Sequence, residues 1–284
     1  PHPLTQTALR TTWSGLLPGL QKLFPKLSDR DLLSGIPGSP TDHHAAPYSP
    51  TEEFASVYRL HSLLPDDYTF RSVVNHAVLG QYELPALAGK QGRKIIEQFD
   101  FADLFYSFGV SHPGALRLHN FPKHLQNFVK DTGERFDLAT VDILRDRERG
   151  VPRYNQFRRL FHKAPVQSFE EITDNPVWAQ EIKRVYDGDL EKVDLLVGLM
   201  CEPLPEGFGF SDTAFRVFVL MASRRLKSDR FLSKEYGPER YTQLGIEWIE
   251  ETSMLDVLKR HFPRVGPALA GVSNAFHPWR QVGA

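Results

Sequence analysis

The sequence predicts a mostly α-helical fold, and three observations support this. Helix start and stop signals recur along most of the 284 residues, and the apolar residues between them recur at helical spacing. Segments that alternate apolar and polar residues, as half-buried strands do, are weak throughout. The length suits one large helical domain or two small ones.

The clearest single element is a capped helix near the N-terminal end. A helix is expected over residues 11–23, and a loop rich in Gly and Pro over residues 34–50. Ser49 is followed by a proline and, three residues on, by Glu52, which is a capping box with proline at the first helical position. The predicted helix continues to Leu64, where the next residue is a helix-ending proline. One face of this helix carries Phe54, Val57, Tyr58, His61 and Leu64.

The rest of the chain is expected to be helical after one irregular stretch. Residues 66–95 are mixed in character and rich in loop signals. A helix over residues 137–149 is closed by Gly150 and Pro152. The further helices are predicted over residues 95–108, 155–162, 176–186, 189–199, 211–227, 238–250 and 254–261.

The bulk composition excludes several classes of protein. The formal net charge of −1 argues against a nucleic-acid-binding protein, which would carry a basic surplus. The single cysteine, Cys201, permits no internal disulfide and is expected to be a small core residue. No apolar run reaches the roughly 18–20 residues of a membrane span, so a soluble or peripherally membrane-associated protein, inside the cell, is expected. The start Pro1-His2-Pro3, without Met, is typical of a piece of a longer protein.

Tyr58 and His61 stand three residues apart on the apolar face of the capped helix. At that spacing both side chains point the same way, about one turn apart. One interpretation is a core tyrosine beside a core histidine. The other is a haem-iron ligand with a redox-active tyrosine next to it, because neutral imidazole is a good axial ligand for haem iron.

The segment around these two residues, PYSPTEEFASVYRLHSLLPD over positions 47–66, resembles the proximal helix of plant-type fatty acid α-dioxygenases. Cyclooxygenases have a related Tyr-x-x-His-x-Leu-Leu-Pro pattern. The resemblance implies that Tyr58 is the radical residue and His61 the proximal haem ligand. Mammalian peroxidases have the histidine without this tyrosine, so the motif favours an oxygenase.

A second segment, residues 137–159, resembles the superfamily stretch that ends Arg-x-Arg and continues to Pro-x-Tyr-Asn. In mammalian peroxidases an Asn there accepts a hydrogen bond from the proximal histidine, and an Arg three residues later meets a haem propionate. The matching positions are Asp142 and Arg145. A carboxylate at position 142, facing His61, would make the imidazole more electron-donating. Without the resemblance, the segment would be interpreted as a solvated, charged helix end.

Further segments resemble the α-dioxygenases in the same order, at residues 185–198, 214–231, 241–261 and 273–276. In that family an arginine of the Arg-Arg-Leu segment helps to bind the substrate carboxylate. Arg225 is the best match, and Arg224 is the alternative because the two arginines are adjacent. A guanidinium suits a carboxylate through two parallel hydrogen bonds. Arg225, in a long apolar helix, is expected to point inward.

The resemblance thus implies the C-terminal portion of a haem peroxidase-like helical domain, occupying residues 1–284, with haem b as cofactor. A peroxide would activate the haem, Tyr58 would become a radical, and that radical would take a hydrogen atom from C2 of a fatty acid. Addition of O2 would give a 2-hydroperoxy fatty acid. The distal histidine, further carboxylate-binding residues and any calcium site are expected in the remaining N-terminal part of the enzyme.

Two other functions are compatible with the sequence. A haem peroxidase of the same superfamily would oxidise small donors with hydrogen peroxide, and lipid-dependent oxygen uptake would distinguish it from a dioxygenase. A haem-free helical interaction domain would be no enzyme at all. A Soret band in the purified protein would exclude that possibility.

Overall fold

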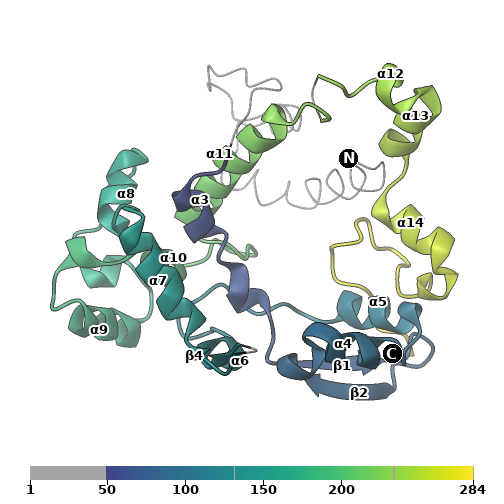
Figure 1. The fold of residues 1–284 in the computed structure, drawn as a ribbon, viewed down its shortest axis with the longest axis horizontal. Coiled ribbons are helices and arrows are strands. Elements are labelled where there is room, and N and C mark those ends of the chain that lie inside the picture. Colours follow the sequence, from purple (N-terminus) through teal and green to yellow (C-terminus); the bar gives the residue numbers. More distant parts are fainter. Residues whose placement is uncertain (1–48, 131, 233, 284) are drawn as a thin grey trace. The chain divides into compact units, whose positions relative to one another are not determined.

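A computed structural model describes residues 49–130, 132–232 and 234–283 (Figure 1). The helix predicted over residues 11–23, and nearly all of the loop predicted over 34–50, lie outside the described residues. Within them the mostly helical fold is confirmed, with two small antiparallel sheets of two strands each. None of the described helices is long and apolar enough to cross a membrane.

The described residues form two compact units, which we describe separately. The first unit consists of residues 65–113 and 226–283, and the second of residues 49–64 and 114–225. The second unit holds α3 (Glu52–Val57), a 3-10 helix (Leu60–Leu63), α6 (Lys123–Gln126), β3 (Phe128–Val129), β4 (Arg135–Phe136), α7 (Leu138–Glu148), α8 (Tyr154–Leu160), α9 (Pro176–Val185), α10 (Leu195–Cys201) and most of α11 (Asp212–Ser228).

The core of the second unit lies where α10 packs against α8 and α3. The backbone of α10 approaches the Tyr154 ring so closely at Gly198 that an added Cβ would lie 2.2 Å from a ring carbon. Only glycine fits such an approach. Cys201 is fully buried in this core, as predicted, and burial raises the pKa of its thiol to about 12. The thiol is therefore protonated and unreactive at neutral pH.

A buried carboxylate ties the start of α11 to this core. Glu202 accepts hydrogen bonds from the Tyr154 hydroxyl (2.5 Å), the Arg158 guanidinium (3.0 Å) and both the hydroxyl and the backbone N–H of Thr213. Burial, together with this carboxylate, raises the pKa of the Tyr154 phenol. The hydrogen bond from the Thr213 N–H gives a partner to a backbone donor that has none within the first turn of a helix. Glu202 therefore positions the helix that carries Arg224 and Arg225.

The first unit combines a hairpin with helices. Its elements are β1 (Asp67–Arg71), β2 (Val78–Glu83), α4 (Gly89–Ile96), α5 (Phe101–Val110), α12 (Pro238–Tyr241), α13 (Gln243–Glu251) and α14 (Met254–His261). Its main core gathers around the fully buried Tyr106 on α5, whose hydroxyl lies 2.6 Å from the His76 ring. The hairpin pairs Asp67 with Glu83, within a stretch that was predicted to be loop-rich.

The prediction of one helix from residue 50 to Leu64 is wrong. α3 begins at Glu52 with Thr51 at the N-cap, and neither Ser49 nor Thr51 caps it through its side chain. The helix ends at Val57, Tyr58 is its C-cap, and a 3-10 helix follows from Leu60.

The break between these two helices follows from a tertiary contact. Arg59 and His61 both lie against the carboxylate of Asp142. On a continuous α-helix, residues two apart point about 200° away from each other, so both could not reach one carboxylate. Pairing with Asp142 therefore requires the interruption at Arg59.

Three more of the predicted helices are each interrupted in the structure, so that two shorter helices take the place of one. In each case the interruption lies at a polar residue. Asp100 accepts a hydrogen bond from the Ala102 N–H and starts α5 as a new helix, which divides 95–108. Asp194 starts α10 and is buried in ion pairs, which divides 189–199. Thr242 has φ of 63° and divides 238–250. The remaining long helices, α7, α9, α11 and α14, lie within one or two residues of their predicted bounds.

Candidate functional site

The buried carboxylate of Asp142, on α7, is the centre of the predicted site. Its Oδ2 lies 3.4 Å from His61 Nδ1, and its Oδ1 lies 3.1 Å from Arg59 Nε. Asp142 is 2% exposed, so its charge is stabilised by these neighbours rather than by water. Neither contact has hydrogen-bond alignment, and both are therefore electrostatic. The predicted contact between His61 and Asp142 is thus present, whereas Arg59 was missed by the sequence analysis.

His61 is oriented as a metal-ligating histidine should be. Metal-bound histidines usually direct their other ring nitrogen at a carboxylate or carbonyl, which fixes the ring and raises its basicity. Here Nδ1 faces Asp142, and the Phe121 ring packs edge-on against the imidazole at 5.7 Å. Among the described residues Nε2 has no polar partner, and the side chain is 27% exposed. These features fit a histidine that would hold a haem iron through Nε2.

Tyr58 lies beside an aromatic cluster, not in the core. Its ring stacks against Phe54 at 5.3 Å and against Phe218 of α11 at 5.9 Å, with the rings nearly parallel. The residue is 54% exposed, so the expectation of a buried position is wrong. The interruption after Val57 turns Tyr58 away from the buried side of α3. The two phenylalanines fix the plane of the ring and leave the residue open to a reactant.

Arg145, predicted to meet a haem propionate, is engaged elsewhere. Its guanidinium donates two hydrogen bonds of 3.1 Å to Glu52 at the start of α3. This pairing links α7 to α3 and leaves Arg59 as the cation nearest to Asp142. The role of Arg145 toward a propionate therefore stays a prediction.

A second buried carboxylate, Asp146, lies one turn beyond Asp142 on α7. The Ser56 hydroxyl donates a 2.7 Å hydrogen bond to it. Burial raises the pKa of Asp146, although that hydrogen bond and the charge of Arg59 lower it. Because the pKa of Asp146 is higher in the folded state, its protonated form contributes stability at low pH. That contribution is lost as the pH rises through the folded-state pKa of Asp146.

The two candidate arginines on α11 differ in burial. Arg225 is exposed, so the expectation that it points inward is wrong. Arg224 is half-buried, and its Nε is buried without a hydrogen-bond partner in the described part of the chain. Buried guanidinium groups normally have partners. Of the two, Arg224 is the one whose environment is incomplete without a ligand.

The charge on Asp142 provides a test of this arrangement. Asp142→Asn should fold, because asparagine has nearly the same shape as aspartate and its side-chain oxygen can still face His61. It should weaken haem retention about 10- to 100-fold, the usual effect of losing a carboxylate behind a ligand. Haem transfer to apomyoglobin measures this directly. Glu148→Gln, the same charge change at an exposed position of α7, is the control. Equal retention in the two variants would show that Asp142 does not act on His61.

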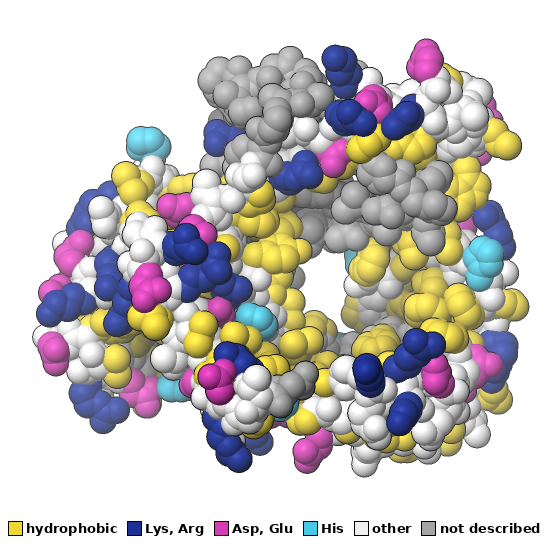
Figure 2. Space-filling model, viewed as in Figure 1, with side chains coloured by type: hydrophobic (Ala, Val, Ile, Leu, Met, Phe, Trp, Pro, Cys, Tyr) yellow, Lys and Arg dark blue, Asp and Glu magenta, His cyan; other side chains and the backbone are white. Residues whose placement is uncertain are grey.

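Ion pairs also cover the surface of this unit. Figure 2 shows Lys and Arg side chains interspersed with Asp and Glu over its visible face. Arg147 of α7 and Arg153 both pair with the buried Asp194, and Asn155 bonds to the backbone of Val166. The Arg-x-Arg and Pro-x-Tyr-Asn pattern is thus explained largely by structural contacts.

Comparisons with known proteins show the family of this chain. The model of the animal haem peroxidase family matches residues 21–270. The α-dioxygenase PIOX of Oryza sativa subsp. japonica is 38% identical over 96% of this chain and 47% of its own length. Alpha-dioxygenase 2 of Arabidopsis thaliana is 39% identical over 95% of this chain and 45% of its own.

A solved structure supports the same relationship. The crystal structure of a variant of the Oryza sativa fatty acid α-dioxygenase with palmitic acid superposes with a TM-score of 0.76 at 38% identity. The superposition covers 83% of this chain and 41% of the rice chain. This chain spans about half the length of the curated relatives that it matches. The resemblance to plant α-dioxygenases is therefore confirmed in sequence and in fold, and the chain belongs to the animal haem peroxidase family.

Proposed function

We propose that this chain forms part of a haem-dependent fatty acid α-dioxygenase, which adds O2 at C2 of a fatty acid. The observation that carries the proposal is the His61 imidazole held against the buried Asp142, three residues after an exposed tyrosine. The names of the relatives, and the palmitic acid in the rice structure, support a dioxygenase over a simple peroxidase.

Each residue has a distinct part in this chemistry. Haem b, held by His61 and activated by a peroxide, would supply the one-electron oxidant. Tyr58 loses an electron and its phenolic proton, then recovers a hydrogen atom from C2 of the substrate. O2 adds to the resulting carbon radical, and the peroxyl radical takes the hydrogen atom back from Tyr58, which gives the 2-hydroperoxy acid and regenerates the tyrosyl radical. Phe54 and Phe218 hold the Tyr58 ring in one plane, which keeps the phenol positioned for abstraction.

Other components of the proposed enzyme are expected beyond the residues described above. A distal histidine and further carboxylate-binding groups would complete the site, and a calcium ion would belong to the same N-terminal part. The substrate's carboxylate would approach α11, because abstraction at C2 requires that end of the molecule to be held.

The carboxylate partner can be identified by comparing two adjacent variants. Arg224→Ala should lower kcat/KM for a free fatty acid about 10- to 100-fold, since a hydrogen bond to a charged group contributes about 1.5–3 kcal/mol. Arg225→Ala, at the exposed neighbouring position, should change it less. Both should keep the haem spectrum. A larger loss in Arg225→Ala would restore the assignment made from the sequence, and no loss in either would place the carboxylate elsewhere.

The proposed reaction is tested by oxygen uptake and product identification. A full-length preparation with haem should consume O2 only when a fatty acid is present, and mass spectrometry should find a 2-hydroperoxy acid or the aldehyde one carbon shorter. Oxidation of small donors by hydrogen peroxide without lipid-dependent oxygen uptake would instead identify a peroxidase.

A further inference from the structure

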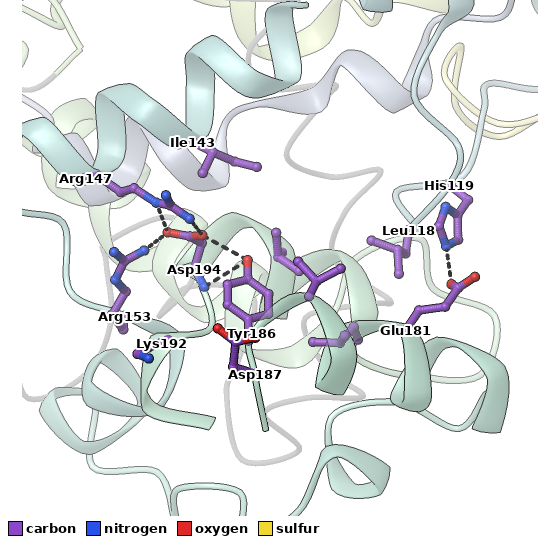
Figure 3. Close-up of a pocket in the computed structure, with 13 residues that line it drawn as sticks. Leu118, His119, Ile143, Arg147, Arg153, Glu181, Tyr186, Asp187, Lys192 and Asp194 are labelled. Atoms are coloured by element: carbon purple, nitrogen blue, oxygen red, sulfur yellow. Dashed lines mark hydrogen bonds and ion pairs between the residues drawn. The ribbon is translucent and has the colours of Figure 1, made fainter. Parts of the chain in front are cut away.

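Two buried carboxylates of the second unit are paired with arginine in different ways. The first, Asp194, accepts two hydrogen bonds from Arg147, at 3.0 and 2.6 Å, and one of 2.9 Å from the Tyr186 hydroxyl (Figure 3). Arg153 pairs with the same carboxylate. Aligned, charge-assisted hydrogen bonds fix the geometry of an ion pair as well as its energy. The ion pairs of Asp194 therefore hold the structure of this unit together.

The second carboxylate, Asp142, is just as buried but has no aligned donor. It is 2% exposed, as Asp194 is, so water cannot replace the protein groups around it. Arg59 Nε lies 3.1 Å from its Oδ1, and His61 Nδ1 lies 3.4 Å from its Oδ2. Within the described ranges, Arg59 Nε, His61 Nδ1 and Asp142 Oδ2 are all buried without a hydrogen-bond partner. Since buried polar groups normally have such partners, Arg59 acts on Asp142 through its charge and not as a structural clamp.

Arg59 is also the arginine on which the acidic residues of α7 depend. One turn beyond Asp142, burial raises the pKa of Asp146, whereas a hydrogen bond and the charge of Arg59 lower it. Arg145, on the same helix, is hydrogen-bonded elsewhere. Among the residues that the structure describes, Arg59 is therefore the arginine that is paired with Asp142 on the side opposite to His61.

Asp142 and Arg59 should have opposite effects on a His61 imidazole that holds haem. A carboxylate behind a metal-bound imidazole attracts the Nδ1 proton and makes the ring more electron-donating. A more electron-donating axial ligand stabilises ferric iron relative to ferrous iron, and the axial ligand and its neighbours are means by which a protein sets the haem potential. A guanidinium at the other oxygen of the same carboxylate draws its charge away from the imidazole, and therefore opposes this effect.

We propose that Arg59 raises the reduction potential of a haem held by His61, by limiting the negative charge that Asp142 presents to the imidazole. Arg59 is thus a positioning residue, which acts on His61 through Asp142. The inference rests on the proposed function, because it takes His61 as the iron ligand. It goes beyond that function because it assigns the control of the haem potential to a third residue.

The midpoint potential of the ferric–ferrous couple tests this role. It is measured on the full-length protein with its haem, without fatty acid, at about pH 8, where carboxyl groups are ordinarily ionised. Arg59→Gln should lower the potential, because Asp142 then attracts the Nδ1 proton more strongly. The equilibrium between ferric and ferrous protein should change at least about tenfold, the lower end of the effect that groups behind a metal ligand have on metal affinity. Tenfold corresponds to about 59 mV for a one-electron couple.

The matched control removes an arginine that pairs with no group near His61. Arg149→Gln makes the same change at an exposed position at the end of α7, and should leave the potential unchanged. An equal fall in Arg149→Gln and Arg59→Gln would show a general effect of charge and would overturn the proposal.

A double substitution separates action through Asp142 from a direct effect of the Arg59 charge on the haem. Asp142→Asn alone should raise the potential. Adding Arg59→Gln to Asp142→Asn should cause no further change, since the carboxylate through which Arg59 acts is gone. A fall of equal size in both backgrounds, or an unchanged potential in Asp142→Asn, would overturn the proposal. The double variant leaves no unpaired carboxylate at position 142, so this comparison still decides if Arg59→Gln alone does not fold.

Resonance Raman spectroscopy of the ferrous protein reports on the imidazole itself. The iron–histidine stretching frequency rises as the Nδ1 proton is drawn away from the ring. It should therefore rise in Arg59→Gln and fall in Asp142→Asn, while Arg59→Lys, which keeps the charge, should stay close to the parent value. A purely structural role of Arg59 would not move the frequency in opposite directions in the first two variants.

The outcomes for this inference and for the proposed function are separable. If the potential and the Raman band respond as expected but fatty acid causes no oxygen uptake, the proposed reaction is wrong and the role of Arg59 stands. If oxygenation proceeds while Arg59→Gln leaves the potential unchanged or raises it, the inference is wrong and the proposed function stands. The absence of an iron–histidine band in the parent protein would exclude His61 as the ligand and overturn this inference with it.

Discussion

His61→Ala should deprive the protein of its haem. The imidazole is the only group in the described residues that we assign as an iron ligand, and alanine offers no lone pair to the metal. Haem affinity should fall by more than about a hundredfold, because loss of a ligand exceeds loss of the group behind it. The fold should persist, since Arg59 still compensates the buried Asp142. Absorbance in the Soret region, per mole of purified protein, measures the effect.

A rescue experiment distinguishes ligand loss from misfolding. Imidazole added to His61→Ala should enter the vacated space and restore part of the Soret band. His112→Ala, at an exposed position, is the matched control and should keep its haem. A normal spectrum with normal oxygenation in His61→Ala would rule out the assignment, whereas circular dichroism would reveal a folding defect.

Tyr58→Phe should abolish fatty acid oxygenation and keep the haem. Phenylalanine conserves the ring that stacks on Phe54 and Phe218, so packing should be unchanged. It lacks the O–H bond from which a phenoxyl radical forms, so abstraction at C2 has no chemical route. Lipid-dependent oxygen uptake should fall to background, while peroxide-driven oxidation of small donors remains.

The same substitution elsewhere tests whether position matters. Tyr82→Phe changes a tyrosine in the hairpin of the first unit and should leave oxygenation intact. Rapid-freeze electron paramagnetic resonance should detect a tyrosyl signal after peroxide in the parent protein and in Tyr82→Phe. Oxygen uptake that survives in Tyr58→Phe would mean that another residue carries the radical.

The sequence predictions were accurate where interactions between residues close in the sequence decide the structure, and inaccurate where interactions between distant residues decide it. α9 and α14 were predicted well because local signals decide them. Asn175 and Ser253 cap their first turns through the side chain, and Ser253 forms a complete capping box with Asp256. The capping box expected at Ser49 failed because Glu52, its second member, bonds to Arg145 of α7 instead. A contact between residues 93 positions apart cannot be predicted from the spacing of neighbouring residues in the sequence.

By itself, the sequence determined the helical class, the family resemblance and the identity of Tyr58, His61 and Asp142 as candidates. Those depend on residue type and order along the chain. Only the tertiary structure decided that Arg59 shares Asp142 with His61, that Tyr58 is exposed, and that α11 turns Arg224 inward in place of Arg225. The arrangement around Asp142 arises because a carboxylate is stable in the interior only when groups of opposite charge lie next to it. These charges come from segments that are distant in the sequence, and their pairing interrupts at Arg59 the helix that local propensity favoured.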